Sequence, residues 1–304
     1  MTWWSAGALS LAMFLTACGS SSSQQPAAAP ASPAGGATVS VVASTNVYGD
    51  IVKQIAGDRA SITSIISNPD ADPHSYEANT RTQLELSKAK VVIENGGGYD
   101  DFVDTMLKSA GGTPKVLNVV DISGKKAADG EELNEHVWYD FATVEKLADQ
   151  LAAVLGEADP AGAATFTANA ATFKQKVQQL QAREAAIKAA HTGAGVAITE
   201  PVPLYMLQAC GLVNKTPAEF SEAIEEGTDV PANVLQKTLD LFAHKDVALL
   251  AYNEQTAGPE TEKVLNAAKA ANVAVVPVTE TLPDGKDYLS WMGGNLTAIE
   301  TALR

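Results

Sequence analysis

The stretch Ala161–His191, AGAATFTANAATFKQKVQQLQAREAAIKAAH, predicts one long unbroken helix in the middle of the chain. It follows Asp159-Pro160, a pair typical of a helix start, and it contains no internal proline. Its apolar residues form a thin stripe: Phe166, Phe173, Val177, Leu180 and Ile187. At about 1.5 Å per residue, such a helix is about 45 Å long and can cross from one domain to another. The stripe lacks the long run of clean heptads that a coiled coil needs, so we expect its polar face to be solvated.

Short β-branched runs lie on both sides of this helix, and helical patterns follow them. The predicted strands before it are Val39–Ser44, Ile62–Ser67, Val91–Glu94 and Val116–Val120. Those after it are Gly195–Thr199, Val247–Tyr252 and Val273–Val278, with Ala218–Ser221 (AEFS) as a weaker candidate. Several are apolar almost throughout, which is typical of strands covered on both faces. The alternation predicts an α/β fold with a mostly parallel sheet flanked by helices in each half.

The first residues predict export and a lipid anchor. Ala6–Ala17 is an apolar run of the length of a signal-peptide core, although no basic residue precedes Lys53. The run ends in Leu15-Thr16-Ala17-Cys18, which resembles the lipobox of bacterial lipoproteins, so Cys18 is the expected site of acylation. The uncharged Ser-, Pro- and Ala-rich segment after it is typical of a flexible tether.

Five segments are therefore expected. They are a lipoprotein signal peptide over 1–17, a disordered tether over 18–37, an N-terminal α/β lobe over 38–158, a linking helix over 159–192 and a C-terminal α/β lobe over 193–304.

Composition excludes one class of partner. The formal net charge is −15 and the sequence pI is about 4.6, whereas proteins that bind nucleic acid present basic surfaces. The chain has two cysteines, and acylation of Cys18 leaves Cys210 without a disulfide partner. Cys210, within MLQACGL, is expected to be a small buried hydrophobic residue.

Four residues that can bind a metal follow predicted strands: His74, His136, Glu200 and Glu280. In open α/β sheets, ligands bind beyond the carboxyl ends of the strands. Two imidazoles and two carboxylates form a complete ligand set for one divalent transition metal. The pattern therefore indicates a metal site in the cleft between the lobes.

Each of these positions also has an ordinary interpretation. A single loop histidine is more often a surface or capping residue than a ligand, and a glutamate after a strand is usually solvated. Glu254 also follows a predicted strand and competes with Glu280 for the fourth position. No clustered motif such as HExxH or CxxC occurs, so the residues alone leave metal binding open.

A series of motifs indicates which class of protein the chain resembles. In chain order they are Asp72-Pro-His-Ser-Tyr-Glu77, Glu94-Asn-Gly-Gly-Gly-Tyr99, Glu135-His-Val-Trp-Tyr-Asp140, Thr199-Glu-Pro201, Cys210-Gly-Leu212 and Tyr288-Leu-Ser-Trp-Met292. This series resembles the zinc/manganese solute-binding lipoproteins of bacterial ABC importers, from about Thr38 to the C-terminus. Two departures from the family pattern flank the second histidine: Glu135 and Phe141 stand where prolines are usual.

The resemblance implies a fold, a site and a partner. It implies two α/β lobes joined by one long rigid helix, with one Mn²⁺ or Zn²⁺ in the interdomain cleft. Carried over by position, the ligands are His74, His136, Glu200 and Glu280. The implied protein is a monomeric, non-enzymatic component of an importer. It delivers metal to an ABC permease from the outer face of the cytoplasmic membrane, to whose lipid it is held through Cys18.

The ligand types do not decide which metal is bound, because affinity rises along the Irving–Williams order while bidentate carboxylates suit manganese. The loop Asp121–Glu135 contains no histidine, whereas zinc members often carry a histidine-rich insertion there, and this favours manganese. Three other functions remain as alternatives. They are a secreted metal-dependent hydrolase, a binding protein for an organic solute and a metal-binding surface adhesin.

Overall fold

The computed structural model describes residues 38–69, 76, 79–127 and 132–304, all within one compact unit that begins at Gly36. The predicted signal peptide, the tether and Cys18 lie outside the described residues, and so does His74. In the described part of the chain, no helix is long and apolar enough to cross a membrane.

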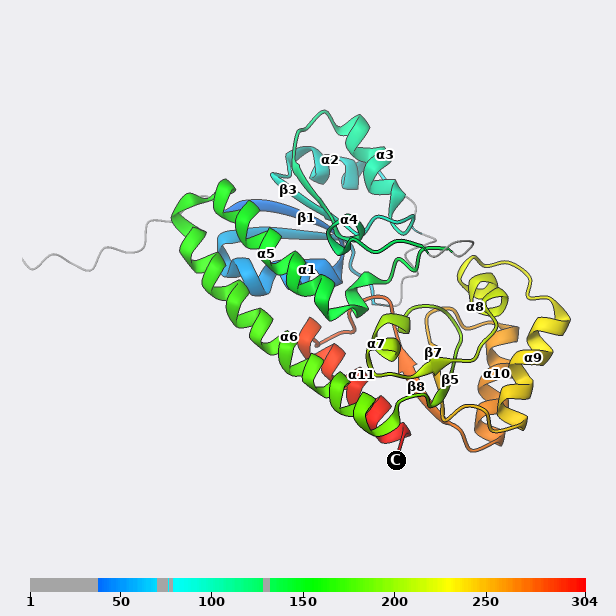
Figure 1. Cartoon of the computed structure of the whole chain (residues 1–304). Helices are drawn as coiled ribbons and strands as arrows, with labels where there is room; N and C mark the ends of the chain where they lie inside the picture. Colours follow the sequence, from blue (N-terminus) through cyan, green and yellow to red (C-terminus); the bar gives the residue numbers. More distant parts are fainter. Residues whose placement is uncertain (1–37, 70–75, 77–78, 128–131) are drawn as a thin grey trace, which may run out of the picture. The chain divides into compact units, whose positions relative to one another are not determined.

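Two four-stranded parallel sheets form the framework (Figure 1). The first has the order β2-β1-β3-β4, and its strands are β1 (Val39–Thr45), β2 (Ala60–Ile66), β3 (Val91–Glu94) and β4 (Lys115–Asn118). The second has the order β6-β5-β7-β8, and its strands are β5 (Gly195–Ile198), β6 (Val213–Asn214), β7 (Leu249–Asn253) and β8 (Ala274–Val278). The α/β prediction is thus confirmed. The N-terminal lobe is named here for the first sheet and its helices, and the C-terminal lobe for the second.

The helices cover both faces of each sheet. They are α1 (Asn46–Ala56), α2 (Thr80–Lys88), α3 (Asp101–Ala110), α4 (Val119–Ser123), α5 (Phe141–Ala158), α6 (Ala163–His191), α7 (Leu204–Ala209), α8 (Ala218–Glu225), α9 (Ala232–Ala243), α10 (Pro259–Ala270) and α11 (Tyr288–Ala302). The long helix predicted from the central stretch is α6, with 29 residues.

One strand prediction was wrong. Ala218–Ser221 is the first half of helix α8, and the fourth strand of the second sheet is instead the two-residue β6. The four letters AEFS are too few to show a helical period. Continued to Glu225, they show apolar residues at Phe220, Ala223 and Ile224, the spacing of one helix face.

Alternate residues of each strand face different cores, as the pleat requires. In β1, Val41 and Ala43 join the core that includes α1 and α5, whereas Val42 packs with Leu86 of α2 and Val103 of α3. The C-terminal lobe repeats this arrangement. Its strands contribute one set of residues to a core under α8, α9 and α10, and the other set to the same large core that runs through the N-terminal lobe.

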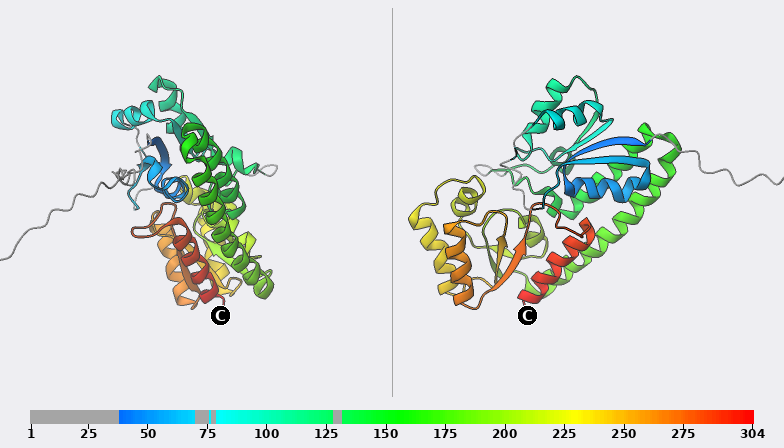
Figure 2. Two further views of the ribbon diagram at one scale, coloured as in Figure 1. Left: turned by 90° about the vertical axis from the view of Figure 1, so that its left-hand side faces the viewer. Right: turned by 180° about the vertical axis from the view of Figure 1, so that it is seen from behind.

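Helix α6 carries that shared core from one lobe to the other. Its buried residues alternate in steps of four and three: Phe166, Ala170, Phe173, Val177, Leu180, Glu184 and Ile187. Helix α5 packs along it, and so does α11, whose parallel course beside α6 is visible from behind in Figure 2. Arg183 of α6 fixes the second contact through two hydrogen bonds, of 3.0 and 2.9 Å, to the Glu300 carboxylate.

Candidate metal centre

Three polar side chains of the C-terminal lobe meet because their strands are neighbours. Strand β7 lies between β5 and β8, and Asn253 is its last residue. Ile198 of β5 pairs with Ala251, so Glu200 stands level with Asn253 on one side. On the other side Asn253 pairs with Val278, and Glu280 follows two residues later. The carboxyl ends of these strands thus bring two carboxylates to one amide.

Asn253 holds both carboxylates through its side-chain amide. Its Nδ2 donates to Oε2 of Glu200 and, over 3.0 Å, to Oε1 of Glu280. The Oγ1 hydroxyl of Thr256 donates a second hydrogen bond of 2.6 Å to the same Glu200 oxygen. Asn253, Glu200 and Glu280 are all at least 98% buried, so these hydrogen bonds form away from bulk water.

His136 approaches this group from the N-terminal lobe. Its Nδ1 lies 2.8 Å from Oδ1 of Asn134, and the Nδ2 of Asn134 donates to the carbonyl of Pro201 over 3.1 Å. With its amide oriented in this way, Asn134 offers an acceptor to the ring, so Nδ1 carries the proton and Nε2 presents a lone pair. Nε2 points at carboxylates, 3.9 Å from Oε2 of Glu280.

Aromatic rings close off the imidazole from solvent. The ring centroid of His136 lies 5.1 Å from that of Trp138 and 5.9 Å from that of Tyr99, and the His136 side chain is fully buried. Tyr99 follows the turn Gly96-Gly97-Gly98, whose residues all have positive φ, a conformation that glycine adopts without strain. The glycine turn therefore places a ring against the histidine.

Two further glutamates approach the imidazole, and the sequence analysis did not assign them as ligands. Oε1 of Glu225, at the end of α8, lies 3.6 Å from His136 Nε2. Ligand atoms of Glu135, His136 and Glu225 all lie within 4.8 Å of one another. The strand wrongly predicted at Ala218–Ser221 hid Glu225, because only the helix turns it toward His136.

Burial makes ionisation of these extra carboxyls unfavourable. Together with the negative charges of Glu135, Glu200 and Glu280, it raises the pKa of Glu225 to about 9. Burial likewise raises the pKa of Glu135 to about 7, with the charge of Glu132 adding to the effect. Buried carboxylates repel one another and are poorly solvated. A bound cation would compensate their charge and stabilise the group.

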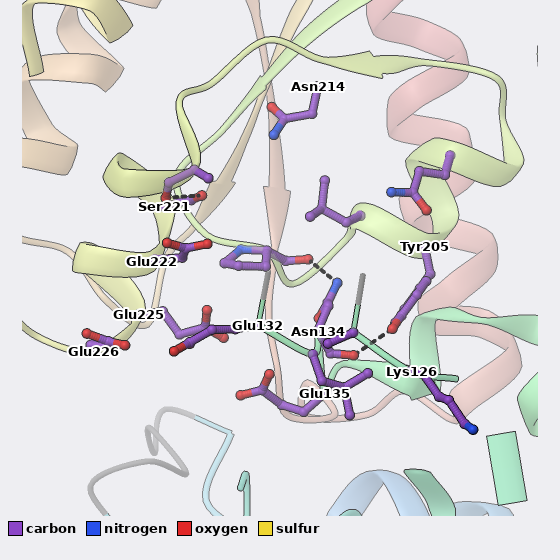
Figure 3. Close-up of a pocket in the computed structure, with 16 residues that line it drawn as sticks. Lys126, Glu132, Asn134, Glu135, Tyr205, Asn214, Ser221, Glu222, Glu225 and Glu226 are labelled. Atoms are coloured by element: carbon purple, nitrogen blue, oxygen red, sulfur yellow. Dashed lines mark hydrogen bonds between the residues drawn. The ribbon is translucent and has the colours of Figure 1, made fainter. Parts of the chain in front are cut away.

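A cavity of about 560 Å³ lies beside these residues and is lined from both lobes. Figure 3 shows Asn134 and Glu135 of the N-terminal lobe on one side and Tyr205 of α7 bonded to Asn134. Glu222 and Glu225 of α8 stand on the other side. The cavity is acidic, and two of its lining glutamates, Glu135 and Glu225, are those that approach His136.

The structure places the predicted site residues as follows. His136, Glu200 and Glu280 lie together, joined through Asn253 and the His136–Glu280 approach. Glu254, the rival of Glu280, is exposed. His74 lies outside the described residues. The sequence did not indicate Asn253, Asn134 or Thr256, because an uncharged side chain after a predicted strand gives no signal of a metal site.

A model of the family described as "zinc-uptake complex component A, periplasmic" matches residues 41–302. The chain belongs to this family. Family membership confirms the resemblance seen in the motifs.

Curated relatives and solved structures agree with this membership. The manganese-binding lipoprotein MntA of Halalkalibacterium halodurans is 29% identical over 48% of each chain. The manganese ABC transporter substrate-binding lipoprotein ScaA of Streptococcus gordonii is 24% identical over 87% of this chain and 89% of its own. The chain spans about half the length of the MntA relatives that it matches.

Two solved structures share the fold of this family member. The periplasmic zinc-binding protein TroA of Treponema pallidum has a TM-score of 0.73 at 18% identity, covering 88% of this chain and 99% of its own. The binding protein FpvC of P. aeruginosa, in complex with Ni²⁺, has a TM-score of 0.72 at 22% identity, covering 88% and 97%.

Proposed function

We propose that this family member captures one divalent transition metal ion, Mn²⁺ or Zn²⁺, outside the cytoplasmic membrane and delivers it to an ABC permease. The observation that carries the proposal is the approach of the His136 Nε2 lone pair to the buried Glu280, which follows a strand end, and to Glu225 at the end of α8. Relatives named for manganese, zinc, iron or nickel support a divalent cargo and leave its identity open.

The proposed ligands are His74, His136, Glu200 and Glu280. For His74 the support comes from its chain neighbours. The carbonyl of Pro69 accepts a hydrogen bond of 2.7 Å from Oγ1 of Thr281, the residue after Glu280. Five residues span at most about 18 Å of extended chain, so a histidine five positions after Pro69 is within reach of Glu280.

Lipid anchoring through Cys18, a location at the outer face of the cytoplasmic membrane and a monomeric state complete the proposal. The lipobox-like sequence and the relatives named as lipoproteins support the anchor. Delivery to a permease is supported by relatives named as components of ABC transporters.

Elemental analysis of the purified protein tests the proposal. We expect about one equivalent of metal in the wild type and its loss in His136→Ala and Glu200→Ala. Removing one ligand from a buried site leaves its partners uncompensated. Glu254→Ala is the matched control, because this glutamate also follows a strand but is exposed, and it should keep the metal. Metal retained at wild-type level in both ligand variants would refute the proposal.

A further inference from the structure

The hydrogen bonds on the two carboxylates limit how each can bind a metal. A carboxylate oxygen has two lone-pair directions. Oε2 of Glu200 already accepts from Nδ2 of Asn253 and from Oγ1 of Thr256. Both of its directions are therefore used inside the protein, and Glu200 would coordinate an ion through Oε1.

The same amide orients Glu280, although it occupies only one lone-pair direction of one oxygen. Its Oε1 accepts from Nδ2 of Asn253 over 3.0 Å, while its Oε2 lies 3.9 Å from the Nε2 lone pair of His136. An ion held between Glu280 and His136 therefore meets Oε2. Its backbone is fixed as well, since the Glu280 N–H donates to Oε1 of Gln255 over 2.6 Å.

Asn253 is itself held rigidly, so the restriction is built into the lobe. Its backbone N–H donates to Oγ1 of Thr199 over 2.9 Å, and its Oδ1 accepts from the Gln255 N–H over 3.1 Å. Both hydrogens of its Nδ2 then point at the carboxylates. The side chain is fully buried.

On the basis of the proposed function, we propose that Asn253, helped by Thr256, is a specificity-determining residue that keeps Glu200 monodentate and turns Oε2 of Glu280 toward the ion. Glu200 then supplies one oxygen instead of two. A low donor count suits Zn²⁺, which takes tetrahedral sites, and disfavours Mn²⁺, which prefers a larger set of oxygens. Asn253 touches the ligands and not the ion, so it acts by positioning.

A preference of the central site for Zn²⁺ is compatible with a loop that lacks histidine, because the two features affect different quantities. Absence of histidine from Asp121–Glu135 says that the loop supplies no extra zinc ligand. Asn253 instead sets the ratio of the two affinities at the central site.

The test compares four variants of the full chain with wild type: Asn253→Ala, Asn253→Leu, Thr256→Val and Thr256→Ser. Competition against a chromophoric chelator gives the dissociation constants for Zn²⁺ and Mn²⁺. Bound Co²⁺ reports the coordination number, since its visible bands are intense with four ligands and weak with six. Leucine keeps water from replacing the lost amide, and serine keeps the hydroxyl donor that valine removes.

We expect the ratio of the Mn²⁺ to the Zn²⁺ dissociation constant to fall about tenfold in both Asn253 variants, the scale on which outer-shell partners act. Thr256→Val should show a smaller fall, and the Co²⁺ bands should weaken in step. Thr256→Ser should match wild type. If Asn253→Ala does not fold, the ratio measured for Thr256→Val decides whether the inference holds.

Two results would overturn the inference. One is an equal loss of affinity for both metals, with Co²⁺ bands of unchanged intensity, because a merely structural residue would behave in this way. The other is an unchanged affinity ratio in every variant. Either result leaves the proposed function standing as long as wild type binds a metal ion. A wild type that binds no Zn²⁺, Mn²⁺ or Co²⁺ refutes the proposed function itself.

Discussion

At the scale of single residues, Asn134 links the state of the histidine to the contact between the lobes. Its Oδ1 accepts from the ring and from the backbone N–H of His136, while its Nδ2 and its carbonyl bond to Pro201 and Tyr205 of the C-terminal lobe. One side chain thus fixes which ring nitrogen faces the carboxylates and where the opposite lobe sits against it.

Replacing Asn134 should weaken metal binding without removing a ligand. In Asn134→Ala the ring loses the acceptor that keeps the proton on Nδ1, and we expect metal affinity to fall about 10- to 100-fold. Asn134→Asp keeps an acceptor for Nδ1 and gives up only the bond to Pro201, so it should lose less. Titration calorimetry of both variants measures the difference, and an equal loss in both would contradict the role assigned to the acceptor.

The titratable residues of the site could be predicted from the sequence, but its asparagines could not. His136, Glu200 and Glu280 could be selected because parallel strands end at one edge and such side chains are rarely idle there. Asn253 and Asn134 carry no charge, and their roles depend on which strands are neighbours and on how the amides are oriented. Neither the strand order nor the orientation of an amide can be predicted from a short stretch of sequence.

At the scale of the elements, helix α6 carries a carboxyl where its pattern calls for an apolar residue. Glu184 continues the four-three alternation of the buried face and is 6% exposed. Its Oε1 accepts no hydrogen bond among the described residues. Burial raises the pKa of Glu184 to about 8 from an ordinary value of 4.5, and the charge of Asp140 adds to the effect.

The raised pKa of Glu184 gives stability a definite dependence on pH. As the pH rises past about 4.5 the unfolded chain gives up this proton, while the folded protein keeps it until about pH 8. The unfolded state then binds fewer protons, so the free energy of unfolding falls across this window. Glu184→Gln removes the titration, and its stability relative to wild type should rise by about 1–3 kcal/mol between pH 5 and pH 8.

Urea unfolding at the two pH values measures this change. Glu184→Met removes the titration and also the buried polar group, so it should exceed wild type in stability at pH 5 as well. The exposed Glu157→Gln, on the neighbouring helix α5, is the control and should show no such trend. A Glu184→Gln variant that tracks wild type at both pH values would refute the assignment.

Elements were predicted well where they are long or uniformly apolar. The strands expected in the sequence differ from those observed by no more than two residues at an end, apart from Ala218–Ser221. Burial on both faces makes such runs apolar throughout, so they stand out. Strand β6, with two residues, is too short for any period, and Glu184 was overlooked because a charged residue does not mark a buried stripe.

At the scale of the whole described unit, several bonds tie the two lobes together away from the metal centre. The side chain of Asn46 in α1 both donates to the carbonyl and accepts from the N–H of Leu282, each over 2.9 Å. Oδ2 of Asp50 accepts from the Tyr288 N–H over 2.8 Å, and the Tyr288 hydroxyl donates to the Trp138 carbonyl over 2.6 Å. With the shared core along α6, these bonds oppose hinge motion.

We therefore expect metal binding to change the separation of the lobes little. Small-angle scattering should give the same radius of gyration for metal-free and metal-loaded protein within error, because a shear of packed helices moves lobes less than a hinge does. His136→Ala, which should stay empty in the presence of metal, supplies the control. A clear compaction on loading, absent in His136→Ala, would show a hinge instead.

The distance in sequence between α6 and α11 has a consequence for how the polypeptide folds during synthesis. Tyr288, Trp291, Met292, Leu296 and Ile299 all belong to the core that both lobes share, and Tyr288 lies against Phe173 of α6. A ribosome synthesises α6 well before α11, so the shared core stays incomplete until α11 has emerged. Until then the nascent chain exposes the apolar partners of these side chains and remains loosely organised.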